Sequence, residues 1–176
     1  MTTTTTRLIA DHTYDLALES PIGTIVLRGD ERTLVQLFLP SERPRPRRTS
    51  GPLPAPVAKA ARQLDEYFAG TRRSFSLDFE LAGTEFQRRV WLSLAEIPYG
   101  ETVSYGELAR AVGHPNAYRA VGSANGANPL AIILPCHRVI ASDGSLGGYG
   151  GGLPTKQRLL DLERRVAEGR KQGRGR

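Results

Sequence analysis

Three short stretches rich in apolar residues near the N-terminus, 14–19, 24–28 and 34–39, are predicted to be strands, and in the first of them apolar residues recur at every second position. A period of two predicts strands with one buried face. Ser20-Pro21-Ile22-Gly23 separates the first two stretches, and proline and glycine there favour a tight turn, so these two strands should form a hairpin. Residues 74–80 alternate in the same way and predict a further half-buried strand.

A helix is predicted between these strands, over 57–68. Its apolar face consists of four residues at spacings of four, three and four, namely Val57, Ala61, Leu64 and Phe68. Gly70 can take the left-handed conformation that ends a helix. The stretch 41–56 contains five prolines with arginines between them and should form an extended surface loop. Residues 1–80 are therefore expected to form a small α+β domain, which contains no catalytic constellation and suggests a scaffold.

From residue 84 the pattern changes to helices with marked starts. Thr84–Gln87 and Ser104–Glu107 are capping boxes, in which two side chains satisfy the free N–H groups of a helix start. Asn116 is expected to cap a third helix over 117–125, and Pro154 suits the first turn of a last helix. The predicted fold class is α+β: a small sheet-plus-helix domain followed by a mostly helical domain.

A helix-turn-helix is predicted within this helical domain, which spans 84–168. Gly113-His114-Pro115 joins its two helices, and the second helix carries small residues that allow its backbone to approach a partner closely. The second helix of such a pair lies against DNA, although tight helix packing would also explain the small residues. The tail, 169–176, is rich in glycine and basic residues and is expected to be disordered.

The net charge of +6 favours a polyanionic partner such as nucleic acid, although plain solubility explains part of it. No apolar run is long enough to span a membrane, and residues 1–7 lack the apolar core of a signal peptide. A single cysteine excludes an internal disulfide and a four-cysteine zinc site, which fits the reducing cytoplasm. The glycine-rich stretch 147–152 lacks the lysine of a phosphate-binding loop, so nucleotide binding is not expected there.

That single cysteine, Cys136, lies beside His137 and follows Pro135. The apolar run 131–134 predicts a strand that the proline ends, which would present the cysteine just beyond the strand. Two interpretations stay open here, because a lone cysteine is as often a buried packing residue as a reactive thiol. Glu163 borders the apolar stripe of the last helix and needs a partner, either a nearby arginine or His137.

Pro135-Cys136-His137-Arg138-Val139 strongly resembles the active-site signature of the O6-alkylguanine-DNA alkyltransferases. The resemblance covers 83–163 and is weaker before residue 80. Further blocks occur in the order of that family: Phe86–Trp91, Ile97–Thr102, Ser104-Tyr105, Arg119–Gly122, Asn128-Pro129 and Gly148–Gly152.

The resemblance implies a DNA repair protein that flips an alkylated base out of duplex DNA. It would transfer the alkyl group from O6-alkylguanine, or from O4-methylthymine, irreversibly to Cys136 and be consumed in that single turnover. His137 and Glu163 would activate the thiol, with the histidine acting through a bound water. Tyr105 would donate a hydrogen bond to the leaving guanine, and Asn128 would brace the turn before the cysteine.

The resemblance also implies a minor-groove DNA interface in which Arg119 enters the base stack. The other implied DNA contacts are Ser104, Tyr105, Ala120, Gly122, Ser123 and Asn125, and the implied substrate pocket is formed by Tyr149, Gly150, Val139 and Arg138. No cofactor and no metal are expected, because Cys136 is the sole thiol and His12 and His114 are far apart in sequence. We expect a monomer with no membrane partner, while cooperation along DNA stays open.

Two alternatives come from other classes of protein. A non-catalytic lesion-binding protein of the alkyltransferase-like kind would share the helix-turn-helix, but such proteins replace the cysteine that is present here as Cys136. A cysteine hydrolase or peroxidase could use adjacent cysteine and histidine for its chemistry but would not need a helix-turn-helix. Alkylation of the thiol by damaged DNA distinguishes all three.

Overall fold

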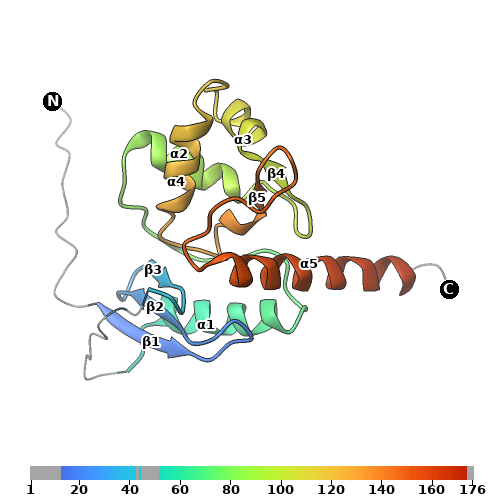
Figure 1. Cartoon of the computed structure of the whole chain (residues 1–176). Helices are drawn as coiled ribbons and strands as arrows, with labels where there is room; N and C mark the ends of the chain where they lie inside the picture. Colours follow the sequence, from blue (N-terminus) through green and yellow to red (C-terminus); the bar gives the residue numbers. More distant parts are fainter. Residues whose placement is uncertain (1–12, 43, 45–51, 174–176) are drawn as a thin grey trace, which may run out of the picture.

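A computed structural model describes residues 13–42, 44 and 52–173 of the chain (Figure 1). The N-terminal half is an antiparallel sheet in the order β1 (Tyr14–Leu18), β2 (Ile25–Gly29), β3 (Leu34–Phe38). One helix, α1 (Ala55–Phe68), packs against all three strands. The loop predicted over 41–56 lies partly outside the described residues.

The predicted hairpin is confirmed, since β1 and β2 pair antiparallel and the backbone N–H of Gly23 donates to the carbonyl of Ser20 at 2.9 Å. The predicted end of α1 is confirmed as well. Gly70 has a φ of +75°, and a Cβ at this position would lie 2.8 Å from a methyl carbon of Val166. Gly70 therefore provides both the left-handed turn and the close approach to the last helix.

The predicted strand over 74–80 is wrong as a regular element. The segment makes a single parallel bridge, between Phe79 and Leu34, and its other residues are not strand. Further along β3, the N–H of Leu37 donates to the carbonyl of Pro129 at 2.8 Å, and Leu37 forms a bridge with Leu130. Because two segments share the free edge of β3, neither of them continues as a strand.

The C-terminal half contains α2 (Glu85–Leu94), α3 (Tyr105–Ala111) and α4 (Tyr118–Gly126), and a parallel pair of two-residue strands, β4 (Val103–Ser104) and β5 (Val139–Ile140). Both predicted capping boxes are present, at Thr84 and Ser104. The predicted cap of α4 is wrong, because the helix starts one residue later than expected, with Ala117 at the capping position and no side-chain cap.

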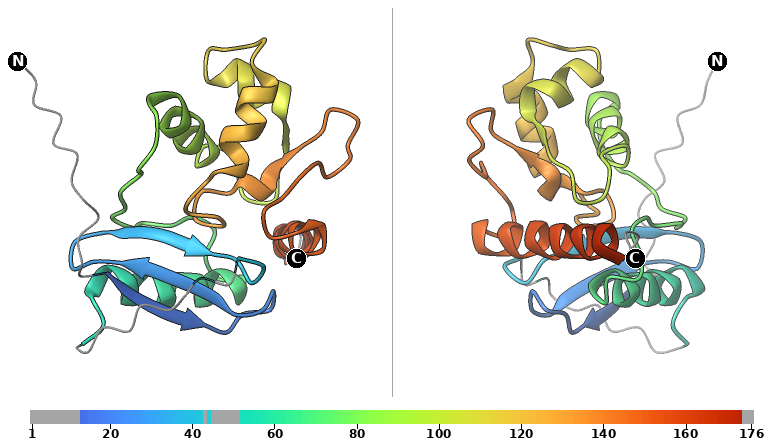
Figure 2. Two further views of the ribbon diagram at one scale, coloured as in Figure 1. Left: turned by 60° about the vertical axis from the view of Figure 1, so that its left-hand side comes forward. Right: turned by 90° about the vertical axis from the view of Figure 1, so that its right-hand side faces the viewer.

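The last helix, α5 (Leu153–Gly173), lies between the sheet half and the helical half, and the two views of Figure 2 agree on this placement. Residues 169–173 are therefore helical, which corrects the expectation of a disordered tail, and 174–176 lie outside the described residues. A buried core runs through both halves and includes Leu27, Leu64 and Leu134. Each such side chain contributes roughly 1.5–3 kcal/mol on burial. The α+β fold class is confirmed.

Candidate active site

Residues 131–134 form consecutive turns instead of the predicted strand. The N–H of Leu134 donates to the carbonyl of Leu130 at 2.8 Å, and Ile132 has a φ of +72°. An apolar run that is buried on all sides has no periodicity, so the sequence pattern cannot distinguish a strand from a buried turn. The Asn128 side chain spans this turn, because its Nδ2 donates to the Leu134 carbonyl at 2.7 Å and its Oδ1 accepts from the Leu130 N–H at 3.0 Å.

Cys136 follows this turn and begins a 3₁₀ helix, η1 (Cys136–Arg138), which leads directly into β5. Cys136 is 5 % exposed and lies on the wall of a cavity of about 330 Å³. The cavity lies between the start of α3, the end of α4 and the glycine-rich loop that precedes α5, and is lined by Leu39, Glu42, Tyr105, Gly122, Asn125, Gly126, Asn128, Ala131, Cys136, Gly148, Tyr149 and Gly150. Its volume is near the lower end of the range for small-molecule sites, about 300–1,000 Å³, and suits one flat heterocycle.

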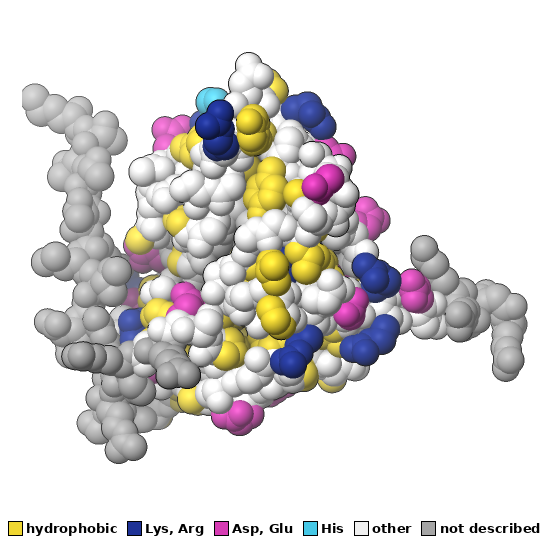
Figure 3. Space-filling view, in the orientation of Figure 1, with side chains coloured by type: hydrophobic (Ala, Val, Ile, Leu, Met, Phe, Trp, Pro, Cys, Tyr) yellow, Lys and Arg dark blue, Asp and Glu magenta, His cyan; other side chains and the backbone are white. Residues whose placement is uncertain are grey.

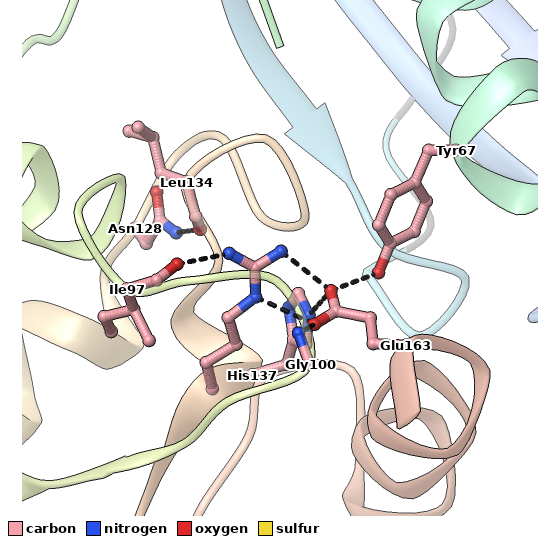
Figure 4. A network of polar contacts seen from close by, with 8 residues as sticks. Tyr67, Ile97, Gly100, Asn128, Leu134, His137 and Glu163 are labelled. Atoms are coloured by element: carbon pink, nitrogen blue, oxygen red, sulfur yellow. Dashed lines mark hydrogen bonds and ion pairs between the residues drawn. The ribbon is translucent and has the colours of Figure 1, made fainter. Parts of the chain in front are cut away.

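Behind the cysteine, Glu163 of α5 is fully buried and accepts five hydrogen bonds (Figure 4). Its Oε1 accepts hydrogen bonds from His137 Nε2 at 2.8 Å, from the Tyr67 hydroxyl at 2.8 Å and from Arg138 Nη2 at 2.9 Å. Its Oε2 accepts hydrogen bonds from Arg138 Nε at 2.9 Å and from the backbone N–H of Gly100 at 2.9 Å. Both partners that the sequence suggests for Glu163 are thus present, and no sequence pattern indicates the other two, Tyr67 and Gly100.

These contacts fix the charge and the tautomer of the pair. Burial raises the pKa of Glu163, but hydrogen bonds and charges from His137 and Arg138 outweigh burial and lower it to about 2. Burial is the largest influence on His137 and lowers its pKa; together with the charges of Arg138 and Lys156 it outweighs Glu163, which raises that pKa, so the imidazole is neutral at pH 7. Because a carboxylate only accepts, Nε2 of His137 carries the hydrogen and Nδ1 is the free acceptor. Within the described part of the chain Nδ1 has no hydrogen-bonding partner.

Burial also raises the pKa of the Cys136 thiol, while the Asn128 side chain and the Lys156 ammonium act in the opposite direction. Lys156 is fully buried. Its Nζ donates to the Val139 carbonyl at 2.6 Å, to the Leu146 carbonyl, and to the Gly148 carbonyl at 3.4 Å. The lysine therefore ties the backbone after Cys136 to the loop over the cavity, and it places a positive charge near the sulfur.

Not every predicted pocket residue lies in the cavity. Tyr149 and Gly150 do, as does Tyr105, and a hydrogen bond from the Tyr149 hydroxyl to the Cys136 sulfur helps to lower the pKa of that thiol. Arg138 and Val139 do not, which corrects the prediction. The tight turn of η1 directs Arg138 away from the cavity, toward Glu163 and the Ile97 carbonyl, and leaves Val139 fully buried.

The helix-turn-helix presents α4 to solvent. Arg119, Ala120 and Ser123 are exposed on it, and Gly122 and Asn125 face the cavity. Ser104 lies at the start of α3 as its cap. The exposed ring of Tyr118 lies 5.8 Å from the Arg119 guanidinium carbon. Basic and acidic side chains are interspersed on the face seen in Figure 3, so charge alone does not delimit a binding surface there.

In the described residues no three metal-ligating side chains come together, and no described helix is long and apolar enough to cross a membrane.

Two family models match the chain. The ribonuclease-like domain of 6-O-methylguanine DNA methyltransferase matches residues 12–81, and the DNA-binding domain of the same family matches residues 85–165. A methylated-DNA–protein-cysteine methyltransferase of Mycolicibacterium paratuberculosis is 52 % identical over 149 residues, which is 84 % of this chain and 90 % of the relative. A protein of the same name from Methanosarcina barkeri is 50 % identical over 158 residues, covering 85 % of this chain and 96 % of the relative.

Solved structures agree with these matches. The crystal structure of Mycobacterium tuberculosis O6-methylguanine methyltransferase superposes with a TM-score of 0.78 at 48 % identity, covering 88 % of this chain and 94 % of that one. A structure of the Mycobacterium tuberculosis protein in complex with DNA gives 0.76 at 47 % identity over the same shares. With both family domains matched and half of the aligned residues identical, the chain belongs to the 6-O-methylguanine DNA methyltransferase family.

Proposed function

We propose that this protein repairs DNA by moving the alkyl group of O6-alkylguanine, and of O4-methylthymine, irreversibly onto its own Cys136. One observation carries the proposal: the sole thiol lies on the wall of a cavity the size of one base, next to a histidine that burial keeps neutral and a carboxylate orients. Such a histidine can accept the thiol proton at neutral pH. The family relationship supplies the lesion that fits this arrangement.

The chemistry begins with the thiol proton. A free thiol is ionised to only about a few per cent near pH 7, and burial makes Cys136 less acidic still. His137 Nδ1 takes the proton through a water molecule, while Nε2–H stays bound to Glu163. The imidazolium that forms is stabilised by the charge of the carboxylate, as in other base–carboxylate pairs.

The sulfur then attacks the alkyl carbon. The S–C bond forms as the bond between that carbon and O6 of guanine breaks, and the bonding pair leaves with the base. Tyr105 donates a hydrogen bond to a ring nitrogen of the departing base, which takes up one proton in place of the alkyl group. In the net reaction, the thiol and alkylguanine give a thioether and guanine. Because the S–C bond of a thioether is not readily broken, the thiol is not regenerated and the protein is used once.

The helix-turn-helix brings the lesion to the sulfur. An O6-alkyl group lies inside the base stack, so the nucleotide must be turned out of the duplex at a cost of a few kcal/mol. Arg119, exposed on α4, fills the gap, while Gly122 and Asn125 of the same helix lie at the cavity. Ser104, Ala120 and Ser123 contact the neighbouring backbone. We place the protein in the cytoplasm as a monomer, where its thiol stays reduced.

The test is to mix the protein with duplex DNA containing O6-methylguanine and to measure the mass of the intact protein by mass spectrometry. We expect the mass to rise by one methyl group in place of one hydrogen, with the modification on Cys136. The Cys136→Ser variant should bind the duplex and keep its mass. Binding of the lesion by the unaltered protein without any change in mass would instead support the non-catalytic interpretation.

A further inference from the structure

We propose that Tyr67, in the N-terminal half, is a positioning residue of the alkyl transfer: its hydroxyl limits how strongly Glu163 acts on His137. The inference rests on the function proposed above. It gives the sheet-plus-helix half a part in the reaction beyond that of a scaffold.

The contact is direct. The Tyr67 hydroxyl donates to Glu163 Oε1 at 2.8 Å, and the same oxygen receives His137 Nε2 at 2.8 Å. Both side chains of the Tyr67–Glu163 pair are fully buried, and 96 residues separate them in sequence. Among the donors to Glu163 in the described residues, Tyr67 is the one that comes from the N-terminal half.

Core packing does not by itself explain this hydroxyl. The Tyr67 ring packs in a group of aromatic rings, with its centroid 5.6 Å from that of Phe75 and 6.0 Å from that of Tyr99. A phenylalanine would fill that space equally well. The hydroxyl is aimed at the one carboxylate that orients the base of the reaction, where a buried hydrogen bond to a charged group is stronger than one between neutral groups.

The physical effect follows from the sharing of one negative charge. Each donor draws charge from Oε1, so removing one leaves more charge to stabilise a protonated His137. The charged groups that act on His137 are Glu163 and Lys156 on α5 and Arg138 on η1, and Cys136 precedes it in the chain. The tyrosines that act on Glu163 in turn are Tyr67 on α1 and Tyr99 on the loop after α2. Replacing Tyr67 with phenylalanine alters only one of these groups and keeps the shape of the side chain.

The expected result is a change in the pH profile. In Tyr67→Phe the pKa of His137 should rise, and the imidazolium cannot accept the thiol proton. The acid limb of the rate of benzyl transfer from free O6-benzylguanine should therefore move to higher pH. A move of about half to one pH unit corresponds to a roughly three- to tenfold lower rate on the acid limb. The rates of the two proteins should converge on the plateau at higher pH.

Tyr99→Phe is the matched control. It removes a second buried hydroxyl from the same aromatic group, but this hydroxyl has no hydrogen-bonding partner in the described part of the chain. Its pH profile should overlay that of the unaltered protein. A loss of rate in Tyr67→Phe by the same factor at every pH would show a merely structural role and overturn the proposal, as would an unchanged profile.

A second measurement does not depend on alkyl transfer. The imidazole nitrogens of His137 can be followed by NMR as the pH is lowered, and His137 of Tyr67→Phe should take up its proton at higher pH than that of the unaltered protein. If the unaltered protein gained no alkyl group, the proposed function would fail while this titration still tested Tyr67. Identical titrations in the two proteins would refute the positioning role alone.

Discussion

At the scale of the residue, the site is organised by one buried carboxylate. Glu163 accepts hydrogen bonds from four residues and pairs with Arg138, which is itself only 4 % exposed. Burying such a pair is costly, and the full set of donors offsets the cost. The carboxylate therefore holds the protein together as well as orienting His137, and the two roles can be separated by experiment.

Glu163→Gln should destabilise the protein by roughly 3–5 kcal/mol, because it leaves Arg138 buried without a counter-charge. Wherever the new NH₂ group points, it also meets an N–H of Arg138, which only donates. Urea unfolding measures the effect. Glu66→Gln is the control, because it breaks a partly exposed ion pair with Arg72 and should cost about 1 kcal/mol or less. Equal losses in both variants would contradict the structural role of Glu163.

The same residues predict how stability depends on pH. The pKa of Glu163 is about 2 when folded, so its contribution is present above its ordinary pKa near 4.5 and is lost as the pH falls toward 2. The pKa of His137 is lowered in the folded protein. Below about pH 6.5 the unfolded chain therefore binds a proton at His137 that the folded protein does not bind. Both effects reduce stability in acid.

We therefore expect the thermal unfolding midpoint to fall steadily from pH 7 to pH 4. In Glu163→Gln the part of this slope below pH 4.5 should be smaller, because the group with the depressed pKa is gone. A midpoint that rose on acidification would rule out a neutral, buried His137.

The sequence pattern also identifies the reacting groups but not the residues that hold them in place. Cys136, His137 and Glu163 belong to a recognisable motif or border an apolar stripe. Tyr67 lies three residues after Leu64 on the buried face of α1, where a tyrosine suggests packing and its distant partner is invisible. Lys156 shows no signal either, because a lysine in an amphipathic helix is expected in solvent. Only the fold brings three backbone carbonyls to its ammonium group.

For helices and strands, the sequence predicts those features that depend on neighbouring residues alone. The capping boxes at Thr84 and Ser104 start α2 and α3 as expected, since a cap is satisfied within four residues. The sequence pattern predicts strands over 74–80 and 131–134, and neither segment forms one. Their conformation depends on which segment reaches the edge of β3 and on how a buried run turns, and both are tertiary effects.

The element that contacts DNA in our proposal is α4, and Arg119 tests it. Arg119→Ala removes the side chain that replaces the flipped base but leaves the cavity intact. We expect its rate with O6-methylguanine in duplex DNA to fall by about tenfold or more, equivalent to about 1.4 kcal/mol in the barrier. Its rate with free O6-benzylguanine should stay unchanged.

Arg62→Ala gives the control for charge, since it removes an exposed arginine from α1, in the other half of the protein. Both of its rates should match those of the unaltered protein. If Arg119→Ala lost the same factor on the free base and on the duplex, the arginine would act on the pocket and not on the DNA.

At the scale of the whole molecule, the division between 1–80 and 84–168 stays a prediction, and many contacts cross it. Leu37 of β3 pairs with Leu130, Tyr67 donates to Glu163, and Gly70 packs against Val166. The helix α5 lies between the halves (Figure 2), and one cluster of buried apolar residues includes side chains of both. Neither half has a core that is complete without its neighbour.

We therefore predict that the two halves unfold together in urea. Trp91, the sole tryptophan, is buried in α2 and reports on the helical half through its fluorescence. Hydrogen exchange of the β2 amides reports on the sheet. The two probes should give the same free energy of unfolding, as an all-or-none transition requires. A sheet that opened at lower urea than Trp91 would show independent halves, and the link from Tyr67 to Glu163 would then break before the site unfolds. Leu37→Ala should lower the free energy of unfolding by the same amount with both probes, since Leu37, which forms a bridge with Leu130, belongs to one shared core.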